Sequence, residues 1–326
     1  MIRLIRVEML RLLSRRLYRM AFIGVLLLIT LIVTVDAAQH TKSAGGEYAK
    51  FKSERLAMYD RAKAQFEAQA GQPGGPPAGT QFPQSREEVE RNPEGFCFSD
   101  GNDQGTNPCG NSPRKPYETK SALGDFGKAV AVICAFAGFL IGASAAGAEW
   151  SAGTMQSLLY WEPRRARVVL AKVVGLAAMI ALLVVAAQSL FTVGALVAGQ
   201  TRGTTAGLSG GVWTGQLLLV ARAAAFAAFA AILGFSIAFA TRVTAAAVGI
   251  AFVYFAILEQ LLVAWKSWLG SYLIGPLLQA WLNNGSTASD YRNLRLTGLR
   301  AGLTLTAYAV IMLTAATVWF RQRDVT

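Results

Sequence analysis

Six long apolar segments separated by polar stretches dominate the pattern of this chain, and they predict an all-α polytopic membrane protein. A helix needs about 20 apolar residues to cross the hydrocarbon core of a bilayer. Spans of about that length are predicted at residues 20–38, 126–147, 168–199, 214–240, 244–264 and 299–320. Within residues 265–298, Gly270, Gly275 and Pro276 interrupt a shorter apolar piece. That piece is too short and too broken to cross, so we expect an external re-entrant hairpin there.

The composition narrows the class of protein further. Of the 326 residues, 53% are hydrophobic and only 15% are charged, and the mean hydropathy is +0.38. In a soluble domain about a quarter of the residues are charged, so charge is scarce in this chain. A disordered protein, a disulfide-rich scaffold and an ordinary cytosolic enzyme are therefore excluded. The formal net charge is +12. The basic residues flank the apolar runs and form no single patch, so no nucleic-acid partner is expected.

Basic residues near the span ends predict the orientation in the membrane. Residues 1–19 form an amphipathic, arginine-rich helix that is expected to lie on the inner membrane surface. Basic residues recur in the segment 148–167, which follows the second span, and in the tail 321–326, which follows the sixth. An even number of spans thus separates each of these segments from the basic N-terminal helix. Both termini are therefore predicted to be cytoplasmic, and the long loop 39–125 is predicted to be extracytoplasmic.

The external loop contains a predicted helix at residues 46–70 and, after a Gly/Pro-rich break, two cysteines. Cys97 and Cys109 would face an oxidising compartment, where a disulfide between them is expected. A metal site would need further ligands nearby, and the single histidine, His40, is far away in the sequence. The third cysteine, Cys134, lies inside the second span and is expected to be a buried apolar residue.

The segment after the second span carries a distinctive order of residues. An acidic residue is followed by a Gly-Thr pair, a Leu pair, a proline and an arginine: Glu149, Gly153, Thr154, Leu158, Leu159, Pro163 and Arg165. A short amphipathic helix of this kind can lie on the membrane surface or dock into a groove of another protein. The residues alone leave both possibilities open.

This order, with Lys172 opening the third span, resembles the signature of permease subunits of type-two, exporter-type bacterial ABC transporters. The layout of a basic interfacial helix, six spans and a broken external hairpin is also similar, although the loop after the first span is long for simpler members. The resemblance implies a permease in the bacterial cell membrane that works with a second permease subunit, identical or paralogous, and with two ATPase subunits. It also implies that residues 149–165 form the coupling helix that inserts into the ATPase.

The sequence adds an independent constraint on the energy source. No Gly-x-x-x-x-Gly-Lys-Ser/Thr string occurs in the chain, so ATP and Mg²⁺ are expected on partner subunits, with no metal or cofactor on this chain. The alternatives are a secondary transporter or an intramembrane enzyme without an ATPase partner. Inverted repeats of similar hydropathy would favour the first, and paired intramembrane acids would favour the second.

Among the charged residues of the predicted spans, Arg222 in the fourth and Glu259 in the fifth stand out. Ionisable groups at membrane depth are costly and normally face a partner, a cavity or a substrate path. Because the two residues are predicted to lie at similar depth, we expect them to pair, and Gln188 and Gln260 could join them. Such a pair could fix helix packing or act as a gate.

Overall fold

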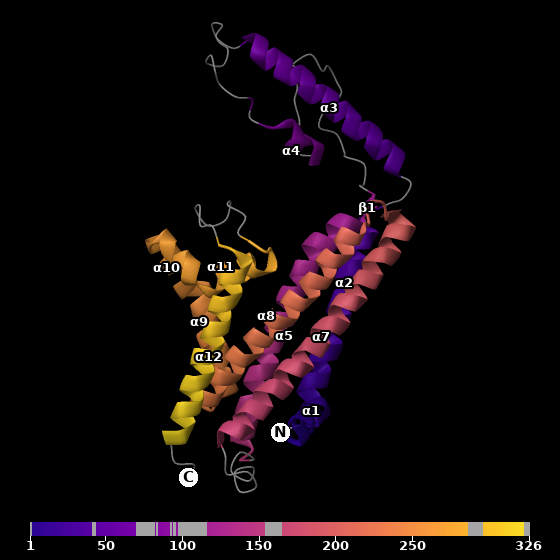
Figure 1. The fold of residues 1–326 in the computed structure, drawn as a ribbon. Coiled ribbons are helices and arrows are strands. Elements are labelled where there is room, and N and C mark those ends of the chain that lie inside the picture. Colours follow the sequence, from indigo (N-terminus) through magenta and orange to yellow (C-terminus); the bar gives the residue numbers. More distant parts are fainter. Residues whose placement is uncertain are drawn as a thin grey trace. The chain divides into compact units, whose positions relative to one another are not determined.

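The computed structural model describes residues 2–40, 44–69, 82, 84–91, 93, 96, 116–153, 165–285 and 296–322 (Figure 1). The chain divides into two compact units. Unit 1 comprises Met1–Ile32, Lys120–Gly194 and Gly207–Thr326, and unit 2 comprises Val33–Thr119 and Ala195–Ala206.

Helices make up nearly all of the regular structure. The first elements are α1 (Ile2–Ser14), α2 (Arg16–Ala38), α3 (Ala44–Gln69), α4 (Arg86–Arg91), strand β1 (Tyr117–Glu118), α5 (Thr119–Ser151), α7 (Arg165–Arg202) and strand β2 (Gly203–Thr204). They are followed by α8 (Gly210–Thr241), α9 (Thr244–Val253), the π-helix η2 (Tyr254–Leu258), α10 (Glu259–Trp265), the 3-10 helix η3 (Ser267–Tyr272), α11 (Ile274–Leu282) and α12 (Gly298–Gln322).

Six helical runs in the described residues are long and apolar enough to cross a membrane, which confirms the predicted fold class. They are Arg16–Ala38, Thr119–Ser151, Arg167–Arg202, Gly210–Thr241, Thr244–Trp265 and Gly298–Trp319. In the second, third and fourth runs 44–61% of the most apolar window is buried, compared with 11–17% in the other three. Helices α5, α7 and α8 therefore form the centre of the bundle, and the remaining spans expose apolar side chains as a bilayer requires.

Glycines bring α5 and α8 into close contact. A Cβ atom on Gly142 would overlap the carbonyl oxygen of Ala231, and one on Gly234 would overlap the carbonyl oxygen of Phe139. Small residues allow such close approach between spans, where van der Waals packing rather than the hydrophobic effect holds helices together. The glycines of these two helices thus allow α5 and α8 to pack tightly.

The fifth span is not a regular α-helix, because η2 inserts a π-helical turn between α9 and α10. In an α-helix, residues five apart lie about 140° around the axis from each other. The wider π-helical turn lets Tyr254 and Glu259 both reach α11. The Tyr254 hydroxyl accepts a hydrogen bond from the backbone N–H of Ile274 (3.1 Å), and Glu259 accepts one from the N–H of Gly275 (3.2 Å).

In unit 2, α3 and α4 enclose a small apolar cluster of their own. It consists of Tyr59, Ala62, Val89 and Phe96, with Leu56, Met58 and Phe82 packed against it. Strands β1 and β2 pair in parallel, with Tyr117 opposite Gly203. Both cysteines of the predicted disulfide, Cys97 and Cys109, lie outside the described residues, so the bridge stays a prediction.

Candidate functional site

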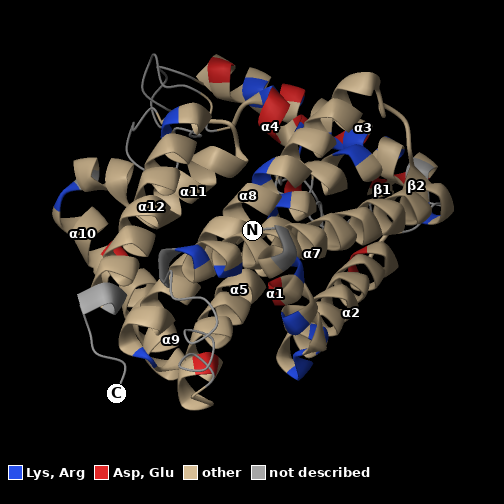
Figure 2. Ribbon diagram, turned by 60° about the horizontal axis from the view of Figure 1, so that its bottom comes forward, with Lys and Arg blue, Asp and Glu red and all other residues tan. Residues whose placement is uncertain are grey.

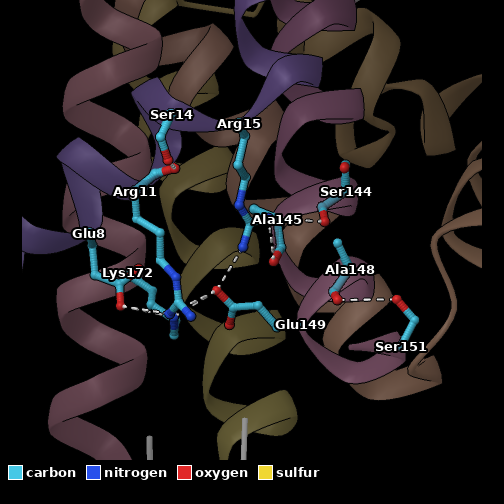
Figure 3. A network of polar contacts seen from close by, with 10 residues as sticks. All are labelled: Glu8, Arg11, Ser14, Arg15, Ser144, Ala145, Ala148, Glu149, Ser151 and Lys172. Atoms are coloured by element: carbon cyan, nitrogen blue, oxygen red, sulfur yellow. Dashed lines mark hydrogen bonds and ion pairs between the residues drawn. The ribbon is translucent and has the colours of Figure 1, made fainter. Parts of the chain in front are cut away.

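Five charged side chains meet where α1, α5 and α7 converge, at the lower end of unit 1 as drawn in Figure 1 (Figure 3). We call them the ion-pair cluster: Glu8, Arg11, Arg15, Glu149 and Lys172. Viewed from this end, the basic positions of α1 and of the beginning of α2 gather beside the end of α5 (Figure 2). The cluster therefore joins residues that are more than 100 positions apart in the sequence.

Lys172 bridges the two carboxylates of the cluster. Its Nζ lies 2.9 Å from Oε1 of Glu149 and 3.0 Å from Oε1 of Glu8. The guanidinium of Arg15 lies 2.9 Å from the same oxygen of Glu149, and Arg11 lies farther away, at 3.8 Å from Glu149 and 3.9 Å from Glu8. Glu8 thus has one close cation and one longer contact, whereas Glu149 has two close cations and one longer contact.

Three members of the cluster are shielded from solvent, because Glu8, Glu149 and Lys172 are each only 5% exposed. Buried charges are costly unless they are paired and hydrogen-bonded, and removing one partner leaves the other uncompensated. Lys172 donates hydrogen bonds to both carboxylates, so its ammonium and the two acids satisfy one another. The arrangement fixes α1, α5 and α7 in one relative position.

The sequence of α1 explains why Glu8 faces inward. Ile5, Glu8 and Leu12 recur at helical spacing on one side of the helix, and Glu8 and Leu12 are buried there. A Cβ atom on Gly175 of α7 would lie 3.4 Å from the Cβ of Glu8, so α1 crosses α7 at that glycine. Lys172 is three residues before Gly175 and faces the same crossing. The predicted interfacial helix is therefore packed on the bundle.

Arg15 lies between α1 and α2 and extends the contact to α5. Besides Glu149 it donates hydrogen bonds to the carbonyl oxygens of Ala145 (3.2 Å) and Ser144 (3.5 Å). A cation near the C-terminal end of a helix is favoured by the helix dipole. This single residue therefore ties the turn between the first two helices to the last turns of α5.

The structure describes the predicted coupling residues only in part. Helix α5 continues through Glu149 to Ser151, and Gly153 follows in a turn with φ of +66°, a left-handed conformation that favours glycine. Arg165 is the first residue of α7. The other four, Thr154, Leu158, Leu159 and Pro163, lie outside the described residues, so their role stays a prediction.

The expected pairing of Arg222 and Glu259 is not found as a direct contact in the described part of the chain, and a link between them through a water or Gln260 stays a prediction. Within the described residues no ion pair joins them. The π-helical turn directs Glu259, which is 5% exposed, to the N-terminal end of α11, where a backbone N–H needs an acceptor. The backbone carbonyl of Arg222 accepts a hydrogen bond from the indole of Trp281 instead (3.0 Å).

The two glutamines considered with that pair lie in different surroundings. Gln188 of α7 is fully buried and donates a hydrogen bond to the carbonyl oxygen of Gly127 in α5 (2.8 Å). Gln260 is exposed. Neither contacts the other in the described structure, and a gating role for any of these residues stays a prediction.

Sequence reasoning missed Glu8 and the contacts of Glu149. The available signal was that Glu8 is the single acidic residue in a helix rich in arginine. Its position on the same helical side as Ile5 and Leu12 could have indicated a buried ion pair. The partner could not be deduced, because Lys172 belongs to a helix that begins more than 150 residues later.

The fold and this cluster define an α-helical polytopic membrane protein whose first helix is ion-paired to the end of its second span and the beginning of its third. The family model of the ABC-2 family transporter proteins matches residues 13–325 of the chain. The chain belongs to this family, and it is a permease subunit of an ABC transporter, a membrane component that works with ABC ATPase subunits. A comparison with curated proteins gives no match.

Proposed function

We propose that the chain is the permease subunit of an ATP-driven exporter in the bacterial cell membrane, with both termini in the cytoplasm. A second permease subunit, identical or paralogous, completes the substrate path. Two ATPase subunits, which carry ATP and Mg²⁺, bind residues 149–165. The observation that carries this proposal is the ion-pair cluster, because it anchors the last turn of α5, where that segment begins.

The cluster gives the coupling segment a rigid support. A force applied to residues 152–164 acts on the end of α5 and on the beginning of α7, which Glu149 and Lys172 hold together at 2.9 Å. Removing one partner of such a buried pair costs about 3–5 kcal/mol, because the other charge is left uncompensated. Movement of the segment is therefore transmitted to α5, α7 and α1 as one body.

Glu149 has a supporting role in this proposal. Its carboxylate is directed into the cluster and is only 5% exposed, so it positions the segment that contacts the ATPase. The contact surface itself is assigned to Gly153, Thr154, Leu158, Leu159, Pro163 and Arg165. Replacing Glu149 should therefore reduce coupling between ATP hydrolysis and transport more than it reduces binding of the ATPase.

Two deletions of equal length test the proposal. The tagged chain is purified together with its ATPase from the native host, once without residues 151–159 and once without residues 71–79 of the Gly/Pro-rich part of the external loop. The first deletion should lose the ATPase, and the second should retain it. Both variants must elute as single species in detergent. Full retention of an active ATPase by the first variant would contradict the proposal, and transport without any ATPase would favour a secondary transporter.

A further inference from the structure

The residue after Glu149 contacts a different part of the bundle. The guanidinium carbon of Arg242 lies 4.5 Å from the ring centre of Trp150, in a cation–π contact. The Trp150 ring also lies 5.8 Å from the ring of Phe239, which stacks on Phe235 at 5.5 Å. Trp150 is thus held against the end of α8.

The turn between α8 and α9 is tight and lies directly against α5. Arg242 adopts a φ of +64° between the end of α8 and the beginning of α9. A Cβ atom on Gly147 would overlap the hydroxyl of Thr244, the first residue of α9. Gly147 and Trp150 are three residues apart and share one side of α5, so this side contacts the turn twice.

Adjacent residues of α5 therefore serve two different groups of helices. Glu149 and Trp150 are about 100° apart around the helix axis. Glu149 contacts α1 and α7 through Arg15 and Lys172, whereas Trp150 contacts the α8–α9 turn through Arg242. Both branches begin in the last turn of α5, next to the proposed coupling segment.

The helices beyond the α8–α9 turn differ in how firmly they are held. Helix α8 is packed tightly against α5 through Gly142 and Gly234. The span that begins with α9 is among the least buried in the structure, with 11% of its most apolar window buried. A displacement of the end of α5 is therefore expected to move α8 with it and to shift the beginning of the fifth span.

We propose that Trp150 and Arg242 are positioning residues of a second branch, which transmits movement of the coupling segment to the fifth span. This inference rests on the proposed function. The first branch, through Glu149, moves α1 and α7. The second acts through the cation–π contact and is independent of the ion-pair cluster.

Hydrogen–deuterium exchange of the complex with its ATPase separates the two branches. Exchange is measured with and without ATP in two peptides, residues 5–14 of α1 and residues 240–247 of the α8–α9 turn. In the natural protein both peptides should change their exchange on adding ATP. Trp150→Leu should abolish the change in 240–247 and preserve it in 5–14, and Glu149→Gln should have the opposite effect.

Variants of Arg242 control for the shape of the turn. Arg242→Gly removes the guanidinium while glycine accepts the positive φ without strain, so it should behave like Trp150→Leu. Arg242→Lys and Trp150→Phe keep a cation and an aromatic ring, and they should restore part of the ATP-dependent change.

The outcomes distinguish the two proposals. If the natural complex responds in 5–14 but not in 240–247, or if Arg242→Gly responds like the natural protein, the second branch is refuted and the proposed function stands. If neither peptide of the natural complex responds to ATP, both proposals are contradicted.

Discussion

Replacing Lys172 by methionine should weaken the structure more than replacing either of its partners. Methionine has a similar length but no charge, so Glu8 keeps only the contact with Arg11 at 3.9 Å, whereas Glu149 keeps Arg15 at 2.9 Å. Removing one partner of a buried ion pair costs about 3–5 kcal/mol. Because Glu149 retains a close cation, we expect about 3 kcal/mol for Lys172→Met, arising mainly from the unpaired Glu8.

A double variant tests whether the cost of Lys172→Met arises from the unpaired Glu8. Glu8→Gln alone leaves the Lys172–Glu149 pair at 2.9 Å intact, so it should cost about 1 kcal/mol, as for one hydrogen bond. Adding Glu8→Gln to Lys172→Met removes the uncompensated charge. The double variant should therefore be more stable than Lys172→Met by about 2 kcal/mol, although it contains one more substitution.

Equilibrium unfolding in mixed micelles, titrated with a denaturing detergent and followed by tryptophan fluorescence, measures these differences. Hydrogen exchange of residues 2–14 shows in parallel whether α1 detaches before the bundle unfolds. Lys266→Met is the matched control, because Lys266 is exposed, and it should leave the free energy of unfolding unchanged. A Lys172→Met protein as stable as the natural one, or additive effects in the double variant, would refute the reasoning.

Three further predictions concern other parts of the chain. Gly142→Ala should cost about 1–3 kcal/mol because its methyl overlaps the backbone of α8, whereas Gly249→Ala, with open space around it, should stabilise α9 by up to about 1 kcal/mol in the same unfolding assay. Glu259→Ala should cost about 1–2 kcal/mol by leaving the first turn of α11 without its acceptor, and Glu259→Gln should cost less because its amide oxygen can accept the same hydrogen bond; equal losses would contradict this role. Alkylation of the purified protein without reductant should modify at most one of the three cysteines by intact mass, and labelling of both Cys97 and Cys109 would exclude the disulfide.

The spans were predictable because their signal is local. About 20 consecutive apolar residues identify a membrane-spanning helix whatever surrounds it. All six predicted spans correspond to helices of the structure, and the helix expected at residues 46–70 corresponds to α3 at Ala44–Gln69. Family resemblance in the segment after the second span was equally local, since it depends on the order of residues within one short stretch.

Contacts between helices were not predictable, because they depend on rotation and register. Arg222 and Glu259 were placed at similar depth by counting residues, but the π-helical turn of η2 changes which side of the fifth span Glu259 occupies. The buried position of Glu8 depends on the glycine at position 175, which lets that side of α1 pack on α7. Neither the π-helical turn nor the crossing point of two helices can be predicted from a single sequence.

The most direct test of the central claim is a photo-crosslink from the coupling segment in living cells. A photoreactive amino acid is introduced at Leu158, and in a separate variant at Phe252, an exposed residue of the fifth span. The account predicts that only the Leu158 variant crosslinks to a protein with a Gly-x-x-x-x-Gly-Lys-Ser/Thr phosphate-binding loop, and that Glu149→Gln preserves this crosslink. An equally strong crosslink to such a protein from Phe252, or none from Leu158 in a complex that hydrolyses ATP, would contradict it.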